Sequence, residues 1–318
     1  MNSRLTYTRR EFGKLALATV PASALFADRL SAQAKINSTI KGVQIGAITY
    51  SFNRIVAQGG VDAIINAYIA IGLGEMEIMS NHAEALVGAP TAGRGGRRGT
   101  PPTPEQEAAL KARNDWRAAA TDATFKPVRD KIQNAGIDLR VLCYNVNTNT
   151  SDADLEYGFR MAKALGVRAM STSTQVSMGK RLAPLAEKYK MPVGFHGHDS
   201  VEQPDEIHNE ASFKAIMAIS SFFNANLDVG HFTAAGGDAV DFIRKYHDRI
   251  TNLHFKDMRR NEGNSYTPFG QGHAPLKEVL LLVSREKYNF PVNIEFEYQG
   301  DPLVEVPKCF QYIKDALA

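Results

Sequence analysis

Short apolar runs alternate with segments of helical periodicity along most of the chain. Residues 43–52, V-Q-I-G-A-I-T-Y-S-F, form the first such run, and residues 61–71 carry apolar side chains at helical spacing before Gly72. The alternation repeats with short connections, which predicts a parallel sheet whose strands are each followed by a helix. Eight repeats over this length fit an α/β fold, the closed (β/α)8 TIM barrel. The strands are predicted at residues 43–52, 75–79, 137–144, 167–172, 192–199, 225–229, 250–255 and 291–296.

The helices of this barrel follow the strands in order. A doubly wound open sheet is the alternative, but no glycine-rich phosphate turn follows the first strand. Residues 88–104 are rich in Gly and Pro, which indicates a mobile insertion loop, either solvated or folded as a lid over a site. The helices are predicted at residues 61–71, 104–134, 152–165, 178–190, 213–223, 238–246, 275–287 and 302–317.

The first 34 residues have the pattern of an export signal. Arg9 and Arg10 precede an apolar stretch, and Ala32-Gln33-Ala34 is a small-x-small cleavage pattern. The apolar stretch is about 12 residues, too short to cross a bilayer, and the paired arginines resemble a twin-arginine signal. An amphipathic N-terminal helix is the alternative. We predict cleavage after Ala34, a periplasmic or otherwise exported protein with no membrane anchor, and a single barrel domain over residues 35–318.

The charge balance bears on nucleic-acid binding, and the two cysteines bear on metal binding and disulfide formation. Of 37 basic and 34 acidic residues, five basic and two acidic ones lie in the first 34 positions, so the mature chain carries 32 of each. The mature chain therefore has no excess of basic residues of the kind that indicates nucleic-acid binding. Cys143 and Cys309 lie far apart and show no metal-binding spacing, which leaves either one disulfide or two separately buried thiols.

Polar side chains alternate with apolar ones on the last four predicted strands. In P-V-G-F-H-G-H-D (192–199) successive side chains of a strand would point to opposite faces, so both histidines would share one face. Active sites of such barrels lie at the carboxyl ends of the strands, so we expect the polar sets to meet at the barrel mouth. They are His196 and His198, Asp228 and His231, His254 and Lys256, and Glu295 and Glu297.

Carboxylates and imidazoles buried together need a compensating cation or proton network. A divalent metal is the simplest compensation, and mixed imidazole and carboxylate ligands suit Mn, Fe, Co, Zn or, less well, Mg. His198 is the alternative ligand to His196, and a hydrogen-bonded polar plug is the alternative to a metal. We predict one divalent ion held by one residue from each strand, namely His196, Asp228, His254 and Glu295.

Four motifs, in order and separated by helices, give the chain a resemblance to a known family. They are G-F-H-G-H-D (194–199), L-D-V-G-H-F (227–232), N-L-H-F-K-D (252–257) and N-I-E-F-E-Y (293–298). With them the mature chain resembles the xylose isomerase-like TIM barrels grouped as sugar phosphate isomerases/epimerases. The resemblance implies one divalent ion bound by a Glu, an Asp, a His and a second Glu on strands five to eight. Asp228, His254 and Glu295 match the last three of these ligands.

The chain departs from the family pattern on the fifth strand. His196 stands there in place of the first glutamate, and imidazole remains a good metal ligand. In epimerases of the family the two metal-bound glutamates also move the proton on the two faces of the sugar. A symmetric two-carboxylate mechanism is therefore in doubt for this chain.

The chemistry implied by the resemblance is removal of a proton next to a sugar carbonyl, with the metal stabilising an enediolate. Lys256 is predicted to stabilise an oxyanion or to act as an acid, and an ion pair with Asp257 or Glu297 is the alternative. The candidates for the base are Glu297, Glu295, His198 and His231.

Four further residues are candidates for holding the substrate. Glu77, inward by parity on the second strand, and His82 just beyond it are predicted to bind sugar hydroxyls, with a capped loop and a solvated face as alternatives. Trp116 and Phe269 are candidates for an apolar platform under a sugar ring.

Three functions remain open at this stage. The first is a metal-dependent sugar isomerase or epimerase. The second is a lyase or hydratase acting on 3-keto-glycosides or other oxidised sugars. Two observations favour it: export would separate the enzyme from the phosphorylated sugars of the cytoplasm, and His196 breaks the symmetric pair of glutamates that an epimerase uses. The third is a non-catalytic sugar-binding barrel. The expected partner is a small sugar, and the resemblance makes a homodimer plausible.

Overall fold

The computed structural model describes residues 34–91, 103–260 and 263–318. The predicted export signal, apart from Ala34, and most of the predicted loop 88–104 lie outside the described residues. Among the helices of the described part, none is long and apolar enough to cross a membrane.

Eight parallel strands close into a barrel, which confirms the predicted fold. The sheet runs β2-β11-β8-β7-β6-β5-β4-β3, and pairing of β2 with β3 closes it; the short β1 (Thr39–Ile40) adds antiparallel to β2. The barrel strands are β2 (Val43–Ile48), β3 (Glu75–Met79), β4 (Asp138–Cys143), β5 (Ala169–Ser173), β6 (Val193–His196), β7 (Phe223–Asp228), β8 (Ile250–Phe255) and β11 (Val292–Ile294).

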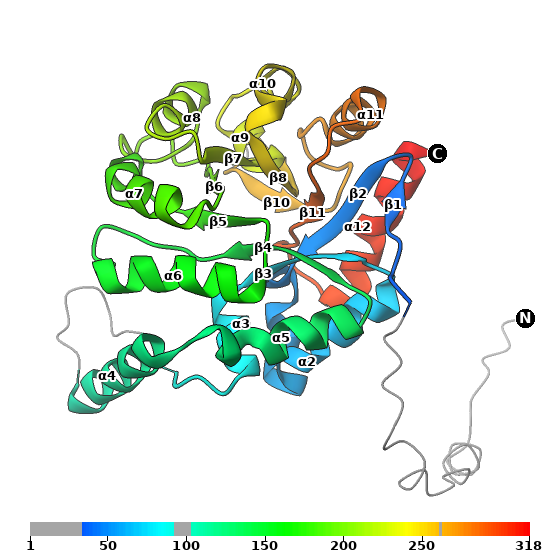
Figure 1. Ribbon diagram of the computed structural model, residues 1–318. Coiled ribbons are helices and arrows are strands. Elements are labelled where there is room, and N and C mark those ends of the chain that lie inside the picture. The colour runs from blue at the N-terminus through cyan, green and yellow to red at the C-terminus, as the bar shows by residue number, and fades with distance from the viewer. Residues whose placement is uncertain (1–33, 92–102, 261–262) are drawn as a thin grey trace, which may run out of the picture. The chain divides into compact units, whose positions relative to one another are not determined.

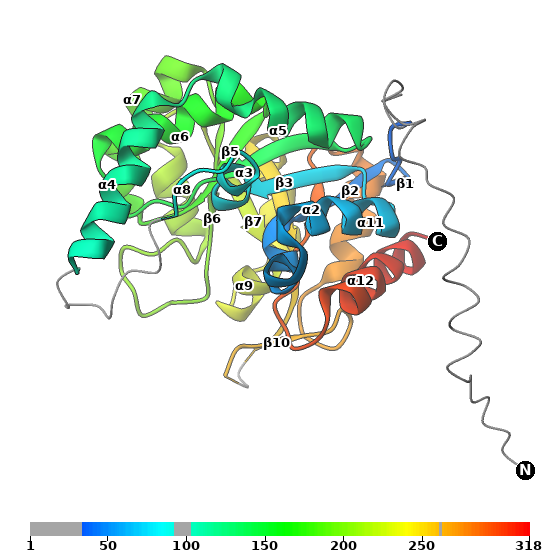
Figure 2. The same ribbon diagram turned by 90° about the horizontal axis from the view of Figure 1, so that it is seen from below.

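Helices follow one another around the barrel in chain order (Figure 1). Apolar strand residues such as Leu227, Leu253 and Phe255 are buried in the core between sheet and helices. Two short additions lie beyond the strand ends, helix α9 and the hairpin β9–β10, and they pack against each other (Figure 2). The helices are α2 (Asn53–Ile71), α3 (Ser80–Leu86), α4 (Pro104–Ala119), α5 (Asp122–Asn134), α6 (Asp152–Leu165), α7 (Gly179–Tyr189), α8 (Glu210–Met217), α9 (Val229–Ala234), α10 (Ala239–Tyr246), α11 (Leu276–Glu286) and α12 (Pro302–Leu317), and the hairpin is β9 (Asp257–Arg259) with β10 (Ser265–Thr267).

The first predicted strand ends earlier than its apolar pattern. β2 stops at Ile48, and Thr49–Phe52 forms a 3-10 turn. Ser51 Oγ donates to the carbonyl of Ile294 and accepts from the N–H of Phe296, so it ties this turn to the end of β11. The turn brings the ends of two neighbouring strands together at the barrel mouth.

Helix boundaries depart from the periodicity where caps intervene. The predicted helix 104–134 is two helices, because Ala120 is extended (ψ 134°) and Thr121 starts α5 with a capping box. The predicted helix 213–223 corresponds to α8, which begins three residues earlier, at Glu210, because the Asn209 side chain accepts a hydrogen bond at the N-cap.

The barrel interior is crowded, and two glycines make room for it. A Cβ on Gly46 would lie 1.7 Å from Glu75 Oε2, and a Cβ on Gly194 would lie 2.0 Å from Thr251 Oγ1. Glycine therefore stands two positions before His196 because the next strands fill the space beneath that imidazole.

Candidate metal centre and active site

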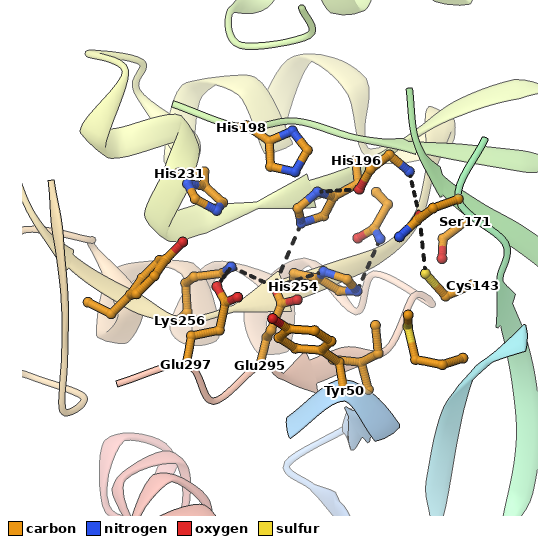
Figure 3. Close-up of a pocket in the computed structure, with 16 residues that line it drawn as sticks. Tyr50, Cys143, Ser171, His196, His198, His231, His254, Lys256, Glu295 and Glu297 are labelled. Atoms are coloured by element: carbon orange, nitrogen blue, oxygen red, sulfur yellow. Dashed lines mark hydrogen bonds and ion pairs between the residues drawn. The ribbon is translucent and has the colours of Figure 1, made fainter. Parts of the chain in front are cut away.

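The four predicted ligands meet at the carboxyl ends of neighbouring strands, and Figure 3 shows three of them, His196, His254 and Glu295. Strand register contributes, since Asp228 of β7 pairs with His254 of β8. One nitrogen or oxygen from each residue lies within 4.8 Å of the others. The group consists of four buried residues, His196, Asp228, His254 and Glu295.

His254 is held so that Nδ1 faces the group. Its Nε2 lies 2.8 Å from Glu77 Oε2, and that carboxylate also accepts from the side chains of Asn252 and Asn293. A carboxylate partner fixes the proton on Nε2 and leaves the Nδ1 lone pair free. Nδ1 lies 3.0 Å from Glu295 Oε2, inside the group.

His196 faces the group through Nε2, whereas His254 faces it through Nδ1. The Nδ1 of His196 lies 3.3 Å from Ser173 Oγ, and its Nε2 lies 3.2 Å from Asp228 Oδ2 and 3.7 Å from Glu295 Oε2. Asp228 Oδ1 accepts from the N–H of His231 and so caps α9, which fixes the direction of the second oxygen. His196 rather than His198 therefore lies within the group.

The surroundings of these residues favour positive charge between them. Burial alone would lower the pKa of His254, but Glu295 and Glu77 raise it well above its ordinary value. Burial would raise the pKa of Asp228, yet the Lys256 ammonium and nearby imidazoles lower it to about 2. The ionised carboxylates attract cations to this point, and a divalent ion would compensate their negative charge as well as protons do.

The donor set fits a divalent ion. His254 Nδ1 and Glu295 Oε2 are buried, and within the described part of the chain neither makes a hydrogen bond of acceptable geometry; their contacts are ion pairs, with each other and between Glu295 and Lys256. Such atoms are costly when left unsatisfied, and coordination would satisfy both. Two imidazoles with two carboxylates suit zinc and other first-row divalent ions.

Replacing Glu77 by glutamine is expected to weaken metal binding by about 10- to 100-fold, because the carboxylate orients His254 without touching the ion. Glu75→Gln is the matched control. Glu75 is buried on the same strand, and burial together with Glu77 raises its pKa well above the ordinary value, so its neutral form resembles an amide. Metal titration by calorimetry measures both variants, and equal affinities would contradict the orienting role.

A cavity of about 240 Å3 opens above the group. Among its lining residues are Tyr50 and Tyr266, whose side chains remain about two-fifths exposed at 39% and 40%. Tyr266 lies edge-on to His231, and the Lys256 Nζ is 5.3 Å from the centre of the Tyr266 ring. Aromatic faces of this kind bind sugar rings well. Neither tyrosine was predicted as a site residue, because Tyr50 lies in the 3-10 turn that replaces the end of the predicted first strand and Tyr266 lies in β10, a short strand that the sequence pattern did not predict.

Two imidazoles in the cavity wall are each supported by a carboxylate. His231 Nδ1 lies 3.0 Å from Asp199 Oδ1, and His198 Nδ1 lies 3.0 Å from Glu206 Oε1. The two rings are 5.4 Å apart and both line the cavity. Burial and the Lys256 charge lower the pKa of His231 despite its acidic neighbours. Each imidazole is therefore oriented with Nε2 available for proton transfer.

Lys256 and Glu297 form an ion pair at the cavity. The Lys256 ammonium also lies 3.0 Å from Asp228 and 2.8 Å from Glu295. Burial would lower the pKa of Lys256, but these three carboxylates raise it well above its ordinary value. This favours the oxyanion-stabilising role over the acid role. Asp257 instead accepts three backbone N–H bonds from residues 270–274 and is not the partner of Lys256.

Four predicted substrate contacts lie elsewhere. Glu77 is fully buried beneath His254, and His82 is bonded to Thr49 Oγ1, where burial lowers its pKa to about 4. Trp116 packs on Phe125 and Tyr157. None of the three lines the cavity, and neither does Phe269. Parity placed Glu77 inside the barrel correctly but could not give its depth.

The cysteines are separate. Cys143 and Cys309 are both buried and free, so the predicted disulfide alternative is wrong. Cys143 lines the cavity, and Cys309 contacts the Tyr298 hydroxyl.

Comparisons with known proteins agree with this fold and site. Residues 173–315 match the family described as Xylose isomerase-like TIM barrel, which supports the resemblance stated above. The segment carries all four strand-end motifs of the site. The part of the chain that holds the site is thus similar to the xylose isomerase-like TIM barrels, and its buried donor set fits a divalent ion.

Individual relatives share less than 30% of their residues with this chain, over about half of their length. The chain is 28% identical over 148 residues to an inosose dehydratase from Bacillus velezensis, a match that covers 40% of this chain and 47% of that protein. The chain thus spans about half the length of the curated relatives that it matches. Two solved structures share the fold alone. One is an L-ribulose 3-epimerase (11% identity, TM-score 0.59, 86% of this chain and 94% of that one), and the other is the IOLI protein with a bound zinc atom (14%, TM-score 0.56, 86% and 96%).

Proposed function

We propose that this chain is a metal-dependent lyase of oxidised sugars. It removes the proton next to a carbonyl and expels a group from the neighbouring carbon. The observation that carries the proposal is the cavity itself, in which two carboxylate-supported imidazoles and the Lys256–Glu297 pair face one buried group of metal ligands. The similarity to inosose dehydratases supports it, since a dehydratase also eliminates.

His196, Asp228, His254 and Glu295 would hold the ion. When bound, a divalent ion supplies Lewis acidity to carbonyl and hydroxyl oxygens and stabilises the negative charge that proton removal creates. Lys256 donates a hydrogen bond to the same developing oxyanion.

Proton transfers fall to the two supported imidazoles. Asp199 holds the Nδ1 proton of His231, so His231 Nε2 accepts the proton from the carbon next to the carbonyl. The bond from the next carbon to its oxygen substituent breaks, and its electron pair leaves with that oxygen. His198, supported by Glu206, gives that oxygen a proton. The products are an unsaturated keto-sugar and a released alcohol or water.

Epimerisation is the second candidate. Figure 3 shows Glu297 on the side of the cavity opposite His198 and His231. A base on one wall and an acid on the other can remove and return a proton on different faces of one carbon. This arrangement differs from the paired glutamates implied by the family resemblance, because His196 is a ligand that carries no proton to the substrate.

Deuterium exchange separates these functions. The metal-loaded mature chain is incubated in D2O with a keto-inositol, a methyl 3-keto-glucoside and unphosphorylated aldoses and ketoses, followed by NMR. Release of methanol or loss of water is expected. Exchange with inverted configuration and no release would favour epimerisation, and absence of exchange with every substrate would overturn both. We propose export by the twin-arginine route, and for that reason the panel is unphosphorylated.

A further inference from the structure

A second polar cavity, of about 270 Å3, adjoins the cavity above the metal ligands, which is called the metal-side cavity below. Its walls come from the segments that follow β4, β5 and β6, at the same end of the barrel as the metal group. Asn145, Ser173 and His198 line both cavities. The two spaces therefore meet at His198, the residue proposed to protonate the leaving oxygen.

The metal-side cavity is small for a complete ligand. At about 240 Å3 it lies below the lower end of ordinary small-molecule sites, ~300 Å3. A substrate whose reacting ring fills it would direct its leaving group past His198 into the second cavity.

The second cavity offers donors and acceptors suited to hydroxyl groups. Asn145 Oδ1 accepts from the N–H of Ser173, and Asn147 Oδ1 accepts from the N–H of Asn149. Both amide oxygens are thus occupied by the backbone, which leaves the NH2 groups to donate to a ligand. Glu206 adds a carboxylate, whose Oε1 lies 3.0 Å from His198 Nδ1 and accepts from the N–H of Ile207.

The same lining argues against other leaving groups. Among the residues that the structure describes, it contains no lysine or arginine, which a phosphate would require, and no Phe, Tyr or Trp, which an aromatic aglycone would favour. Val146 is the single aliphatic residue in the described part of this lining. A neutral polyol is the chemistry that these walls match.

We infer that the second cavity binds a second sugar ring, so that the substrate is an oxidised disaccharide and the leaving group is a sugar. The inference rests on the proposed function, because it takes the metal-side cavity as the site of the reacting ring.

Saturation-transfer NMR and calorimetry test it without turnover. The probes are methyl glucoside, maltose and cellobiose, the last two covering both linkages, each with the metal-loaded mature chain. Saturation is expected on both rings of at least one disaccharide, with tighter binding than for methyl glucoside. Asn147 and Gln175 both line the second cavity and do not line the metal-side cavity. Asn147→Ser and Gln175→Ala are each expected to weaken disaccharide binding about fivefold, the effect of one neutral hydrogen bond, and to leave methyl glucoside binding unchanged.

Asn149→Ala is the matched control, since this exposed side chain lies in the same loop and does not line the cavity. Saturation confined to one ring of both disaccharides, or variants that weaken both ligand types equally, would overturn the inference. Turnover separates the two proposals. Equal cleavage of methyl 3-keto-glucoside and the oxidised disaccharide refutes the second subsite alone. Disaccharide binding without release of its second sugar supports the subsite and refutes the lyase.

Discussion

Asp228→Asn is expected to abolish bound metal and turnover together while the barrel stays folded. The variant removes one ionised oxygen from the ligand group and one carboxylate from Lys256. It keeps the cap of α9, because asparagine caps helices as well as aspartate does. Metal affinity should fall by more than the ~100-fold that loss of an orienting partner costs.

Asp238→Asn is the control for this variant. Asp238 caps α10 with the same geometry, its oxygen accepting from the N–H of Asp241, and it lies outside the cavity. Metal content after dialysis, read by mass spectrometry, and deuterium exchange are measured on both proteins. Metal retained at the wild-type level in Asp228→Asn would remove this residue from the ligand group.

His231→Gln is expected to lower kcat by about 10²- to 10⁴-fold, the contribution of a positioned general base. Its metal content should not change, because His231 does not belong to the ligand group. Asp199→Asn should give a smaller loss together with an altered pH profile. The amide still contacts His231 Nδ1 but no longer fixes which nitrogen carries the proton.

His247→Gln is the matched control for the base. His247 is exposed and stacks on Tyr288, with a ring separation of 4.5 Å. Wild-type exchange rates in His231→Gln would exclude it as the base and leave Glu297, which lines the same cavity, as the residue to test next.

The period of two along a strand was enough to predict which side chains enter the barrel. It assigned His196, Asp228, His254 and Glu295 to one face, and these residues do converge. Parity also placed Glu77 inside the barrel, where the structure buries it beneath the cavity, and His82 just beyond that strand lies in α3 and does not line the cavity. Parity gives the face of a strand but says nothing about height along the barrel axis.

Pairing between loops was also beyond the sequence pattern. Asp199 supports His231 across 32 positions, and Glu206 supports His198 from an irregular segment. No periodicity links such partners, because loops follow local turn geometry rather than a repeat.

By itself, the sequence determined the order of strands and helices, the closed barrel and the four residues that meet at its mouth, because strand and helix periods are local properties of the chain. Only the tertiary structure decided which nitrogen of each histidine faces the centre, which carboxylates support the two free imidazoles, and where the cavity ends. Those features depend on distances of a few ångströms between segments that are remote in sequence, and on how deeply each side chain is buried.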